Sequence, residues 1–424
     1  MLDIKRIREH HTEIIEALHK RGIDAHSQID NALKLDEHRR SLQTKLDDTL
    51  AQLNALSKDI GILFREKKID EANAAKAQTG ELKEQGKQLQ EKLKTVEAEL
   101  NAQLLDIPNT PHELVVSGTT AEENEIVKTH GDIREWTKNM KPHWELAETH
   151  KLIDFELGVK VSGSGFPFYT GKGARLQRAL INMFIDHNTA HGYQECQAPL
   201  LVNEASGYGT GQLPDKEGQM YHITEDNLYA IPTAEVPLTN IFRDVIIKEN
   251  ELPKKITGYT PCFRREAGSY GKDVRGLNRL HQFDKVEIVC VDRPDNSYNR
   301  LNEMVEHVEQ LLQKLELPYR VLRLCGGDMG FTAAMTYDFE VYSAAQQRWL
   351  EVSSVSNFET FQANRLKLRY RGDDKKTHLC HTLNGSSLAL PRIVACLLEN
   401  FQDESGIAIP KALVEYTGFS RIDL

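Results

Sequence analysis

A regular spacing of apolar and small residues between positions 42 and 100 constrains the fold of this chain more than any other feature. Two series of such residues alternate steps of four and three along the chain: Leu42, Leu46, Thr49, Leu53, Leu56, Ile60 and Leu63, and then Ala75, Thr79, Leu82, Gly86, Leu89, Leu93, Val96 and Leu100. This heptad spacing puts each series on one stripe of an α-helix. Because a short polar break near residues 65–71 separates the stripes, we predict an antiparallel helical hairpin over about residues 27–105.

The residues of this hairpin allow two interpretations. A dimerising or spacing coiled coil is the simpler one, because the basic and acidic residues nearly balance and can form a solvated face. Arg65, Lys67 and Lys68 make the predicted tip basic, which suits contact with the phosphates of an RNA. Pro108 disfavours helix in the residue before it. We therefore place a first domain at residues 1–110 and a second at 111–424.

Length, charge and the amino terminus limit the class of protein. At 424 residues the chain is long enough for two domains with buried cores. A net charge of −10 and a pI near 5.9 exclude a wholly basic nucleic-acid coat but leave a local basic surface open. The first residues are charged where a signal peptide needs an apolar core, and no stretch is apolar enough to span a membrane. We expect a cytoplasmic protein without membrane contact.

The cysteines and histidines do not form a familiar metal-binding pattern. Six cysteines are scattered without a C-x-x-C pair, which indicates reduced thiols. The segment HLCH at 378–381 does not have the spacing of a common zinc site. We therefore expect no zinc.

Beyond about residue 115 the helical spacing gives way to strands and helices in alternation. Residues 176–187 and 304–315 have helical spacing, and strand-like runs occur at 194–202, 221–231, 256–266, 281–291 and 339–354. Adjacent strands joined by the loop 267–280 would pair antiparallel. The second domain is therefore predicted to be α+β, with an antiparallel sheet flanked by helices.

The stretch FRREAGSYGKDVRGLNRLHQFDKVEIV, residues 263–289, gathers positive charge in an acidic protein. If residues 256–266 form one strand, Arg264 and Glu266 share a face. On the returning strand Phe283, Lys285 and Glu287 share a face, and the apolar residues between them face the core. A stacking ring, a forked cation and a carboxylate on one exposed face predict a nucleotide site.

The same stretch resembles motif 2 of the class II aminoacyl-tRNA synthetases, in the form found in the seryl-tRNA synthetase family. Motif 2 spans about residues 256–291. Three further segments agree in order: 173–202 resembles motif 1, the dimer-interface element; Ile231-Pro-Thr-Ala-Glu235 resembles the serine-binding loop; and 383–402, which contains LNGSSLALPR, resembles motif 3. The hairpin is similar to the amino-terminal coiled coil with which this family reaches the long variable arm of its tRNA.

The resemblance implies a two-step reaction. Serine would react with ATP to give seryl-adenylate and pyrophosphate, and the seryl group would then pass to tRNA(Ser), and to tRNA(Sec) in addition. Positioning and charge neutralisation would supply most of the catalysis. ATP with Mg²⁺ is the implied cofactor, and a homodimer the implied assembly.

The resemblance also implies roles for individual residues. Arg264 and Arg392 are the expected catalytic cations. The expected ATP-binding residues are Arg264, Arg265, Glu266, Arg279, Phe283, Glu351, Val352, Ser353, Ser354 and Arg392, of which Glu351 and Ser354 would also hold Mg²⁺. The expected serine-binding residues are Thr233, Ala234, Glu235, Glu287 and Ser386. On a straight strand Glu351 and Ser354 would face opposite ways, so their shared role requires the strand to bend.

Two other functions remain open from the sequence. A non-catalytic RNA-binding or regulatory protein of the same fold would tolerate loss of Arg264, Glu266, Glu351 or Arg392, and all four are present. A paralogue that loads an amino acid onto a carrier protein would be expected to lack the long hairpin.

Overall fold

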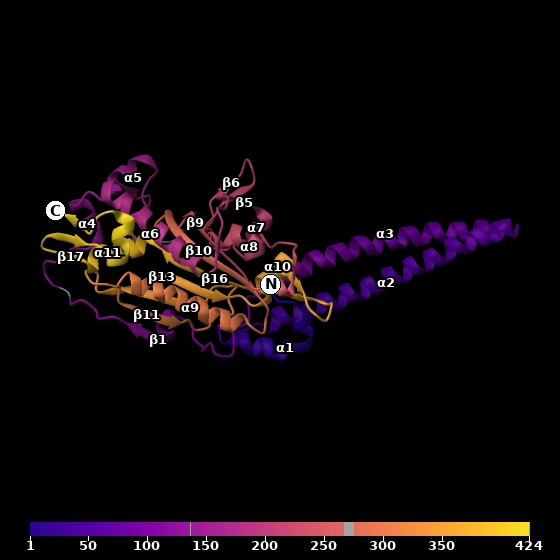
Figure 1. Ribbon diagram of the computed structural model, residues 1–424. Helices are drawn as coiled ribbons and strands as arrows, with labels where there is room; N and C mark the ends of the chain where they lie inside the picture. The colour runs from indigo at the N-terminus through magenta and orange to yellow at the C-terminus, as the bar shows by residue number, and fades with distance from the viewer. Residues whose placement is uncertain (136, 267–274, 424) are drawn as a thin grey trace. The chain divides into compact units, whose positions relative to one another are not determined.

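The computed structural model of the chain describes residues 1–135, 137–266 and 275–423. Their contacts divide them into two compact units (Figure 1). One consists of residues 2–19 and 23–108, and the other of residues 1, 20–22 and 109–424. None of the described helices is long and apolar enough to cross a membrane.

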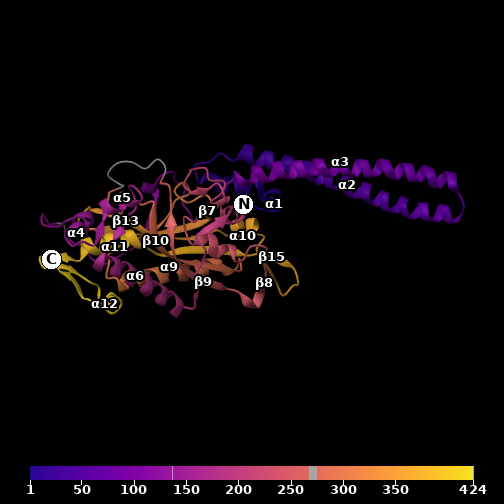
Figure 2. The same cartoon turned by 90° about the horizontal axis from the view of Figure 1, so that it is seen from above.

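The first unit consists of three helices: α1 (Ile4–His19), α2 (His26–Arg65) and α3 (Ile69–Leu105). α2 and α3 run side by side along their length, as Figures 1 and 2 show from two directions. The predicted hairpin is confirmed, and the heptad residues are all buried or half-buried. Leu42 and Leu46 pack against Leu93 and Val96 in a small apolar core.

A buried carboxylate fixes α1 against α2. Asp36, whose side chain is 0% exposed, accepts hydrogen bonds from Arg8 at 2.7 Å, Arg39 at 2.9 Å and Arg40 at 3.1 Å. Burial raises the pKa of the Asp36 carboxyl, but the hydrogen bonds from Arg39 and Arg8 outweigh this effect and hold the pKa below its ordinary value. The carboxylate is therefore stabilised in its charged form.

The second unit is built on an eight-stranded sheet, which confirms the predicted α+β class. Its strands, in spatial order, are β1 (Glu125–His130), β11 (Tyr319–Arg323), β12 (Met335–Ser343), β13 (Arg348–Asn357), β16 (His381–Ala389), β10 (Gln282–Asp292), β9 (Lys254–Phe263) and β4 (Gln194–Glu195). All neighbours pair antiparallel except β4 and β9, which are parallel.

Three helices cover one face of this sheet: α6 (Gly171–Ala190), α9 (Ser297–Lys314) and α11 (Leu390–Asn400). Apolar residues of all three join Val286, Ile288 and Cys290 of β10 in one core, so this face of the strand is apolar, as predicted. The alternate residues Val289 and Val291 pack in a second core with residues of α8 (Glu235–Asn240) and α10 (Thr360–Leu366). β10 is therefore covered on both faces.

The remaining elements are short. The helices are α4 (His143–Thr149), α5 (Phe155–Val161), α7 (Glu204–Thr210) and α12 (Lys411–Thr417), with 3₁₀ turns at Ala121–Glu123 and Glu249–Glu251. The small sheets contain β2 (Ile153–Asp154) and β3 (Phe168–Tyr169); β5 (Leu201–Asn203), β6 (His222–Ile223) and β7 (Leu228–Ala230); β8 (Ile246–Lys248), β14 (Arg369–Arg371) and β15 (Thr377–Leu379); and β17 (Gln402–Asp403), β18 (Gly406–Ala408) and β19 (Arg421–Asp423).

Replacement of the buried carboxylate tests its role. We expect Asp36→Asn to lower the free energy of unfolding by about 1.5–3 kcal/mol near neutral pH, because charge-assisted hydrogen bonds from three arginines are lost. The difference from the wild type should shrink as the pH falls through the lowered pKa of Asp36, since the wild-type carboxyl then loses its charge as well. Denaturant unfolding followed by far-UV circular dichroism measures both effects.

Asp47→Asn is the matched control, because Asp47 lies exposed on the same helix and bonds only to Gln43 among the contacts described. Equal stabilities of the two variants would contradict the role of Asp36.

Candidate active site

The guanidinium of Arg264 covers the ring of Phe283 on β10. Arg264 lies just beyond the end of β9, and its guanidinium carbon is 5.2 Å from the centre of the ring. Its Nε donates to the carbonyl oxygen of Pro232 at 3.4 Å. Its backbone N–H donates to the carbonyl oxygen of His281 at 2.9 Å, one step beyond the paired strands. The structure thus brings together the cation and the aromatic ring that the sequence singles out.

The prediction of a strand from 256 to 266 is wrong at its end. β9 stops at Phe263, and Glu266 has a φ of 50°, in the left-handed region that a strand cannot contain. The alternation that placed Arg264 and Glu266 on one face therefore does not apply. The Glu266 carboxylate instead lies 3.3 Å from Nη1 of Arg279, which precedes β10. This ion pair joins the two ends of the loop between β9 and β10.

The described start of this loop also contacts a segment outside the two strands. The backbone N–H of Arg265 donates to the carbonyl oxygen of Gln219 at 2.8 Å, which ties the start of the loop to the segment before β6. Gly268 and Gly271, two glycines of motif 2 that would let this loop move over a bound nucleotide, lie outside the described residues.

A β-bulge on β13 brings Glu351 and Ser354 to one face. In the pairing with β12, Asp338 lies opposite Ser354 and Glu340 lies opposite Glu351, so Val352 is the extra residue. The hydroxyl of Ser354 donates to Oε1 of Glu351 at 3.3 Å. The bend that the sequence required is present.

Asp338 is a member of this cluster that sequence reasoning missed. It is the partner of Ser354 across the two strands, and its Oδ1 is buried without a hydrogen-bond partner among the described residues. Burial raises the pKa of the Asp338 carboxyl, and the nearby Glu351 carboxylate raises it further. Asp338 reaches this cluster because β12 pairs with β13 in this register. A single Asp beside a strand-like run does not reveal that pairing.

Arg392 connects the bulge to the loop end. It follows Pro391 in the first turn of α11. Its Nη1 donates to the backbone carbonyl of Glu351 at 2.6 Å and lies 3.6 Å from the carboxylate of the same residue. Its Nε donates to the carbonyl oxygen of Asn278 at 3.2 Å.

A second cluster is built around Glu287 in the middle of β10. Glu287 is 1% exposed and Lys285 is 6% exposed, so the prediction of a solvated face is wrong at these two positions. Oε2 of Glu287 lies 3.0 Å from Nζ of Lys285 and accepts from the hydroxyl of Thr233 at 3.3 Å, and Oε1 accepts from Asn384 at 3.2 Å. The pairing partners make burial of the charge possible.

Glu235 is a buried carboxyl group with fewer partners. Its Oε1 accepts from the amide of Gln362 at 2.6 Å, and its backbone N–H donates to the hydroxyl of Thr233 at 3.2 Å. Burial raises the pKa of Glu235 to about 7, although the hydrogen bond from Gln362 acts in the opposite direction; the charge of Glu287 adds to the rise. This carboxyl can therefore change its charge near neutral pH.

The remaining predicted residues have buried side chains, so they offer mainly backbone groups to these clusters. Ala234 is fully buried, and Val352 packs in the main core. The hydroxyl of Ser353 donates to the carbonyl oxygen of Ser386 at 2.6 Å, and Ser386 lies opposite Glu287 in the pairing of β10 with β16. The sequence did not indicate Asn384 or Gln362 as members of the site, because only the fold brings them to Glu287 and Glu235.

A buried histidine anchors the end of the loop. His143 on α4 accepts a hydrogen bond at Nε2 from the backbone N–H of Leu277 at 2.8 Å, so its Nδ1 carries the proton and donates to Glu399 of α11 at 2.7 Å. Glu399 in turn accepts from the hydroxyl of Ser343. Gly276 has a φ of +66°, and a Cβ at that position would lie 2.3 Å from Nε2 of His143. The loop end therefore fits against the imidazole only with glycine at 276.

Taken together, the two clusters offer complementary chemistry. Three arginines and an aromatic ring suit a nucleotide with its phosphates, and the oxygens of Asp338, Glu351 and Ser354 suit a hard divalent cation. Buried carboxyl groups and hydroxyls suit a small ligand with an ammonium and a hydroxyl group.

Comparisons with known proteins agree on one family. Residues 1–111 match the model "Seryl-tRNA synthetase N-terminal domain", and residues 220–401 match "tRNA synthetase class II core domain (G, H, P, S and T)". The chain is 53% identical to the "Serine--tRNA ligase" of Salinibacter ruber over 100% of this chain and 99% of that protein. It is 48% identical to the protein of the same name from Methylacidiphilum infernorum over 98% of this chain and 99% of that protein.

Two solved structures are similar over the whole length. Seryl-tRNA synthetase from Pyrococcus horikoshii, complexed with ATP, superposes with a TM-score of 0.92 at 33% identity and covers 100% of this chain and 99% of its own. Cytoplasmic serine-tRNA ligase from Naegleria fowleri, in complex with AMP, gives 0.87 at 28% identity with the same coverage. The resemblance predicted from the sequence motifs is confirmed, and with it the class II fold.

The anchor of the loop can be tested with two glycines. We expect Gly276→Ala to lower the free energy of unfolding by about 1–3 kcal/mol more than Gly218→Ala does, because the new methyl group must displace the ring of His143. Gly218 is the control, since its φ is +67° and no atom of the described residues lies within 4 Å of its Cβ position. Denaturant unfolding of both variants measures the difference. Equal losses would show that the contact with His143 does not constrain residue 276.

Proposed function

Since this chain belongs to the seryl-tRNA synthetase family, we propose how its residues divide the work of a ligase that joins serine to tRNA. The proposed course is formation of seryl-adenylate from serine and ATP, followed by transfer to tRNA(Ser). The arrangement that carries this proposal is the position of Arg264 over Phe283 together with that of Arg392 between Glu351 and the loop end at Asn278. A non-catalytic protein of this fold would have no need to keep these charges together.

Arg264 and Phe283 are the proposed contacts of the α-phosphate and the adenine ring. The guanidinium and the ring are already neighbours, so a nucleotide that stacks on Phe283 would place its first phosphate near Arg264. Glu266 would accept from the adenine amine, with Arg265 beside it. Arg279 and Arg392 would hold the terminal phosphates. Val352 and Ser353 would contribute backbone contacts to ATP, because their side chains are buried.

The donor set at the bulge fits Mg²⁺. Two carboxylates and a hydroxyl offer the oxygen ligands that this ion requires, and Oδ1 of Asp338 is buried without a hydrogen-bond partner among the described residues. Glu351 and Ser354 would hold the ion, with Asp338 near by. Bound with ATP, Mg²⁺ would neutralise phosphate charge there. We propose no role for zinc in this reaction.

Glu235 is the proposed partner of the serine ammonium. Lys285, Thr233 and Asn384 already use both oxygens of Glu287, whereas Glu235 has one side-chain partner, Gln362, among the contacts described. Glu287, Thr233 and Ser386 would then orient the serine hydroxyl, with Ala234 forming the wall. The serine carboxylate would be left free to attack the α-phosphorus of ATP, and pyrophosphate would leave.

Loss of the cation at the reacting phosphate should stop activation. We expect Arg264→Ala to lower the rate of ATP–pyrophosphate exchange by about 10²–10³-fold, or roughly 2.7–4 kcal/mol, as for other groups that stabilise developing charge. Arg371→Ala is the control, because Arg371 is exposed on β14. Exchange at the wild-type rate would sink the assignment of Arg264.

The raised pKa of Glu235 predicts a pH dependence. Because a carboxyl with a pKa of about 7 gains a proton as the pH falls, the form that binds an ammonium is lost. We expect the KM for serine in the exchange reaction to rise about tenfold from roughly pH 8 to pH 6. The KM for ATP should not follow this profile. Glu235→Gln should bind serine more weakly with a flat profile, and a variant that keeps the wild-type slope would assign the titration to another group.

The helical hairpin is the proposed tRNA-binding element, within an amino-terminal domain at about 1–110 that precedes a catalytic domain at 111–424. Arg65, Lys67 and Lys68 lie exposed at the turn between α2 and α3. Phe64 and Ile69 beside them are 48% and 59% exposed, so the tip offers apolar surface next to positive charge. Such a surface suits the backbone and bases of an RNA better than a purely structural turn.

Shortening the hairpin should separate the two steps. Thr49 and Gly86 face each other across the helices, with 4.0 Å between the Thr49 methyl group and a Cβ built on Gly86. Deleting residues 50–85 and closing the gap with a short turn therefore keeps the core of Leu42, Leu46, Leu93 and Val96. Pyrophosphate exchange should persist, and aminoacylation of tRNA should fall sharply. Undiminished aminoacylation would identify the hairpin as a spacer.

Binding of tRNA, measured at increasing salt concentrations, tests the basic tip. Replacement of Arg65, Lys67 and Lys68 by Ala should weaken tRNA binding and reduce its dependence on salt, since each lost phosphate contact lowers the slope by about 0.7–0.9. Lys92→Ala with Lys94→Ala is the control, because both lysines are exposed on α3 away from the turn.

The remaining parts of the proposal concern assembly and range. We propose a homodimer through the motif 1 region, where Leu200 and Leu201, and Phe168 just before the region, are large apolar residues left exposed. We also propose a cytoplasmic location and the charging of tRNA(Sec). A carrier-protein-loading enzyme is the alternative, and total tRNA as acceptor in the aminoacylation assay distinguishes the two.

A further inference from the structure

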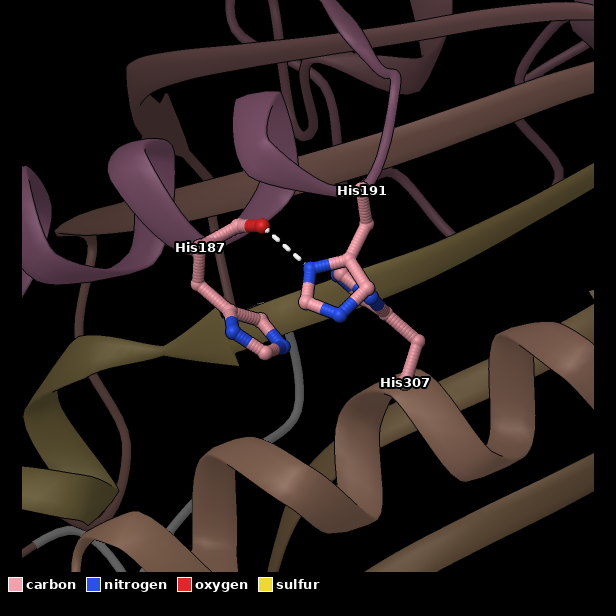
Figure 3. A group of neighbouring side chains, drawn as sticks. All are labelled: His187, His191 and His307. Atoms are coloured by element: carbon pink, nitrogen blue, oxygen red, sulfur yellow. Dashed lines mark hydrogen bonds between the residues drawn. The ribbon is translucent and has the colours of Figure 1, made fainter.

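Three histidines meet where the end of α6 approaches α9. His187 and His191 are four residues apart at the end of α6, and His307 lies on α9. One ligating atom of each lies within 4.8 Å of those of the other two (Figure 3). His187 and His307 are 4% and 5% exposed, whereas His191 is exposed at the surface. None of them belongs to the active site described above.

The hydrogen bonds of two rings leave one nitrogen free on each. Nδ1 of His191 donates to the carbonyl oxygen of His187 at 2.7 Å, as the dashed line in Figure 3 shows, so its Nε2 carries the lone pair. Nε2 of His307 lies 2.7 Å from Oδ1 of Asn188 and donates to it, so its Nδ1 carries the lone pair. Histidines that bind metal ions commonly donate their second ring N–H to a carbonyl oxygen in this way.

The third ring has a buried nitrogen without a partner. Nε2 of His187 makes no hydrogen bond among the described residues, and its Nδ1 lies 2.9 Å from Nζ of Lys314. Burial lowers the pKa of His187 to about 4 and that of His307 to about 3, with the neighbouring charges adding to the shifts. Both rings are therefore neutral near pH 7, which is the form that binds metal ions.

We propose that His187, His191 and His307 form a binding site for a first-row transition metal ion such as Zn²⁺. Three neutral imidazoles are a ligand set that such ions accept, and a water molecule would complete a tetrahedron. Bond lengths of about 2.0–2.1 Å require the three nitrogens to approach to about 3.4 Å from one another. The exposed ring of His191 can make most of this movement. The ion would join the end of the motif 1 helix to α9.

Lys314 opposes this site and provides a test of it. Its ammonium donates to Nδ1 of His187, so it repels a cation and keeps the proton of that ring on Nε2. Ligation through Nε2 therefore requires Lys314 to move away and the proton to shift to Nδ1. Lys314 is exposed and can turn into solvent when the ion binds. Removal of its charge should therefore strengthen metal binding, which a purely structural cluster of histidines does not predict.

The experiment measures binding of Co²⁺ and Zn²⁺ to the full chain after treatment with a chelator. Co²⁺ is followed by its visible absorption and Zn²⁺ by calorimetry, in excess Mg²⁺ so that the carboxylates of the active site do not compete. We expect one equivalent per chain. His191→Gln and His307→Gln should each weaken binding by at least the roughly 10–100-fold that loss of an outer partner costs, and Lys314→Gln should tighten it.

His378→Gln is the matched control, because His378 is a surface histidine paired with Asp374 outside the cluster. The surface position of His191 keeps the test valid if His307→Gln fails to fold. Absence of a bound equivalent in the wild type would overturn the proposal, as would wild-type affinity in His191→Gln. Pyrophosphate exchange should be the same with and without Zn²⁺, which separates this site from the proposed reaction.

Discussion

The buried ion pair of Lys285 and Glu287 on β10 is the interaction on which the rest of the catalytic unit depends. A carboxylate at 1% exposure is tolerated only where its partners are fixed, and here they come from three directions: Lys285 on the same strand, Thr233 from the segment before α8, and Asn384 from β16. The central strand must therefore be covered on both faces and paired on both edges before the charge can be buried. Burial of this charge therefore requires the packed cores on both faces of β10.

The arginines of the site are balanced in the same way. Arg264 lies over Phe283, Arg279 pairs with Glu266, and Arg392 bonds to Glu351. Each cation has a local partner that also belongs to the site. A ligand with several negative charges would meet guanidinium groups already held in place, so that less side-chain freedom is lost on binding.

Much of this could be predicted from the sequence, and the exceptions have identifiable causes. The heptad residues between Leu42 and Leu100 were sufficient for the hairpin, because a helix stripe is a local property. The alternation along β10 gave the correct core face. It failed for the exposure of Lys285 and Glu287, since strand periodicity separates two faces but does not say what covers each.

The other exceptions depend on pairing or on backbone conformation. The chain turns at Glu266 because the φ of this residue is positive, and the sequence FRREAG does not predict a positive φ at a glutamate. Asp338 enters the site only through its register against Ser354, and His143 only through contact between α4 and the loop end. These residues are distant in sequence, so a motif cannot contain them.

The matched stripes of the hairpin have a consequence for how its length can change in evolution. Because α2 and α3 bury each other's heptad positions, an insertion in one helix alone would rotate every later residue out of the seam. Away from the tip, length can change without this penalty when both helices gain or lose seven residues at the same level, which moves the tip by about 10 Å. The length of the hairpin therefore changes in steps rather than continuously. Relatives with longer or shorter hairpins would differ from this chain by one or more heptads in each of the two helices.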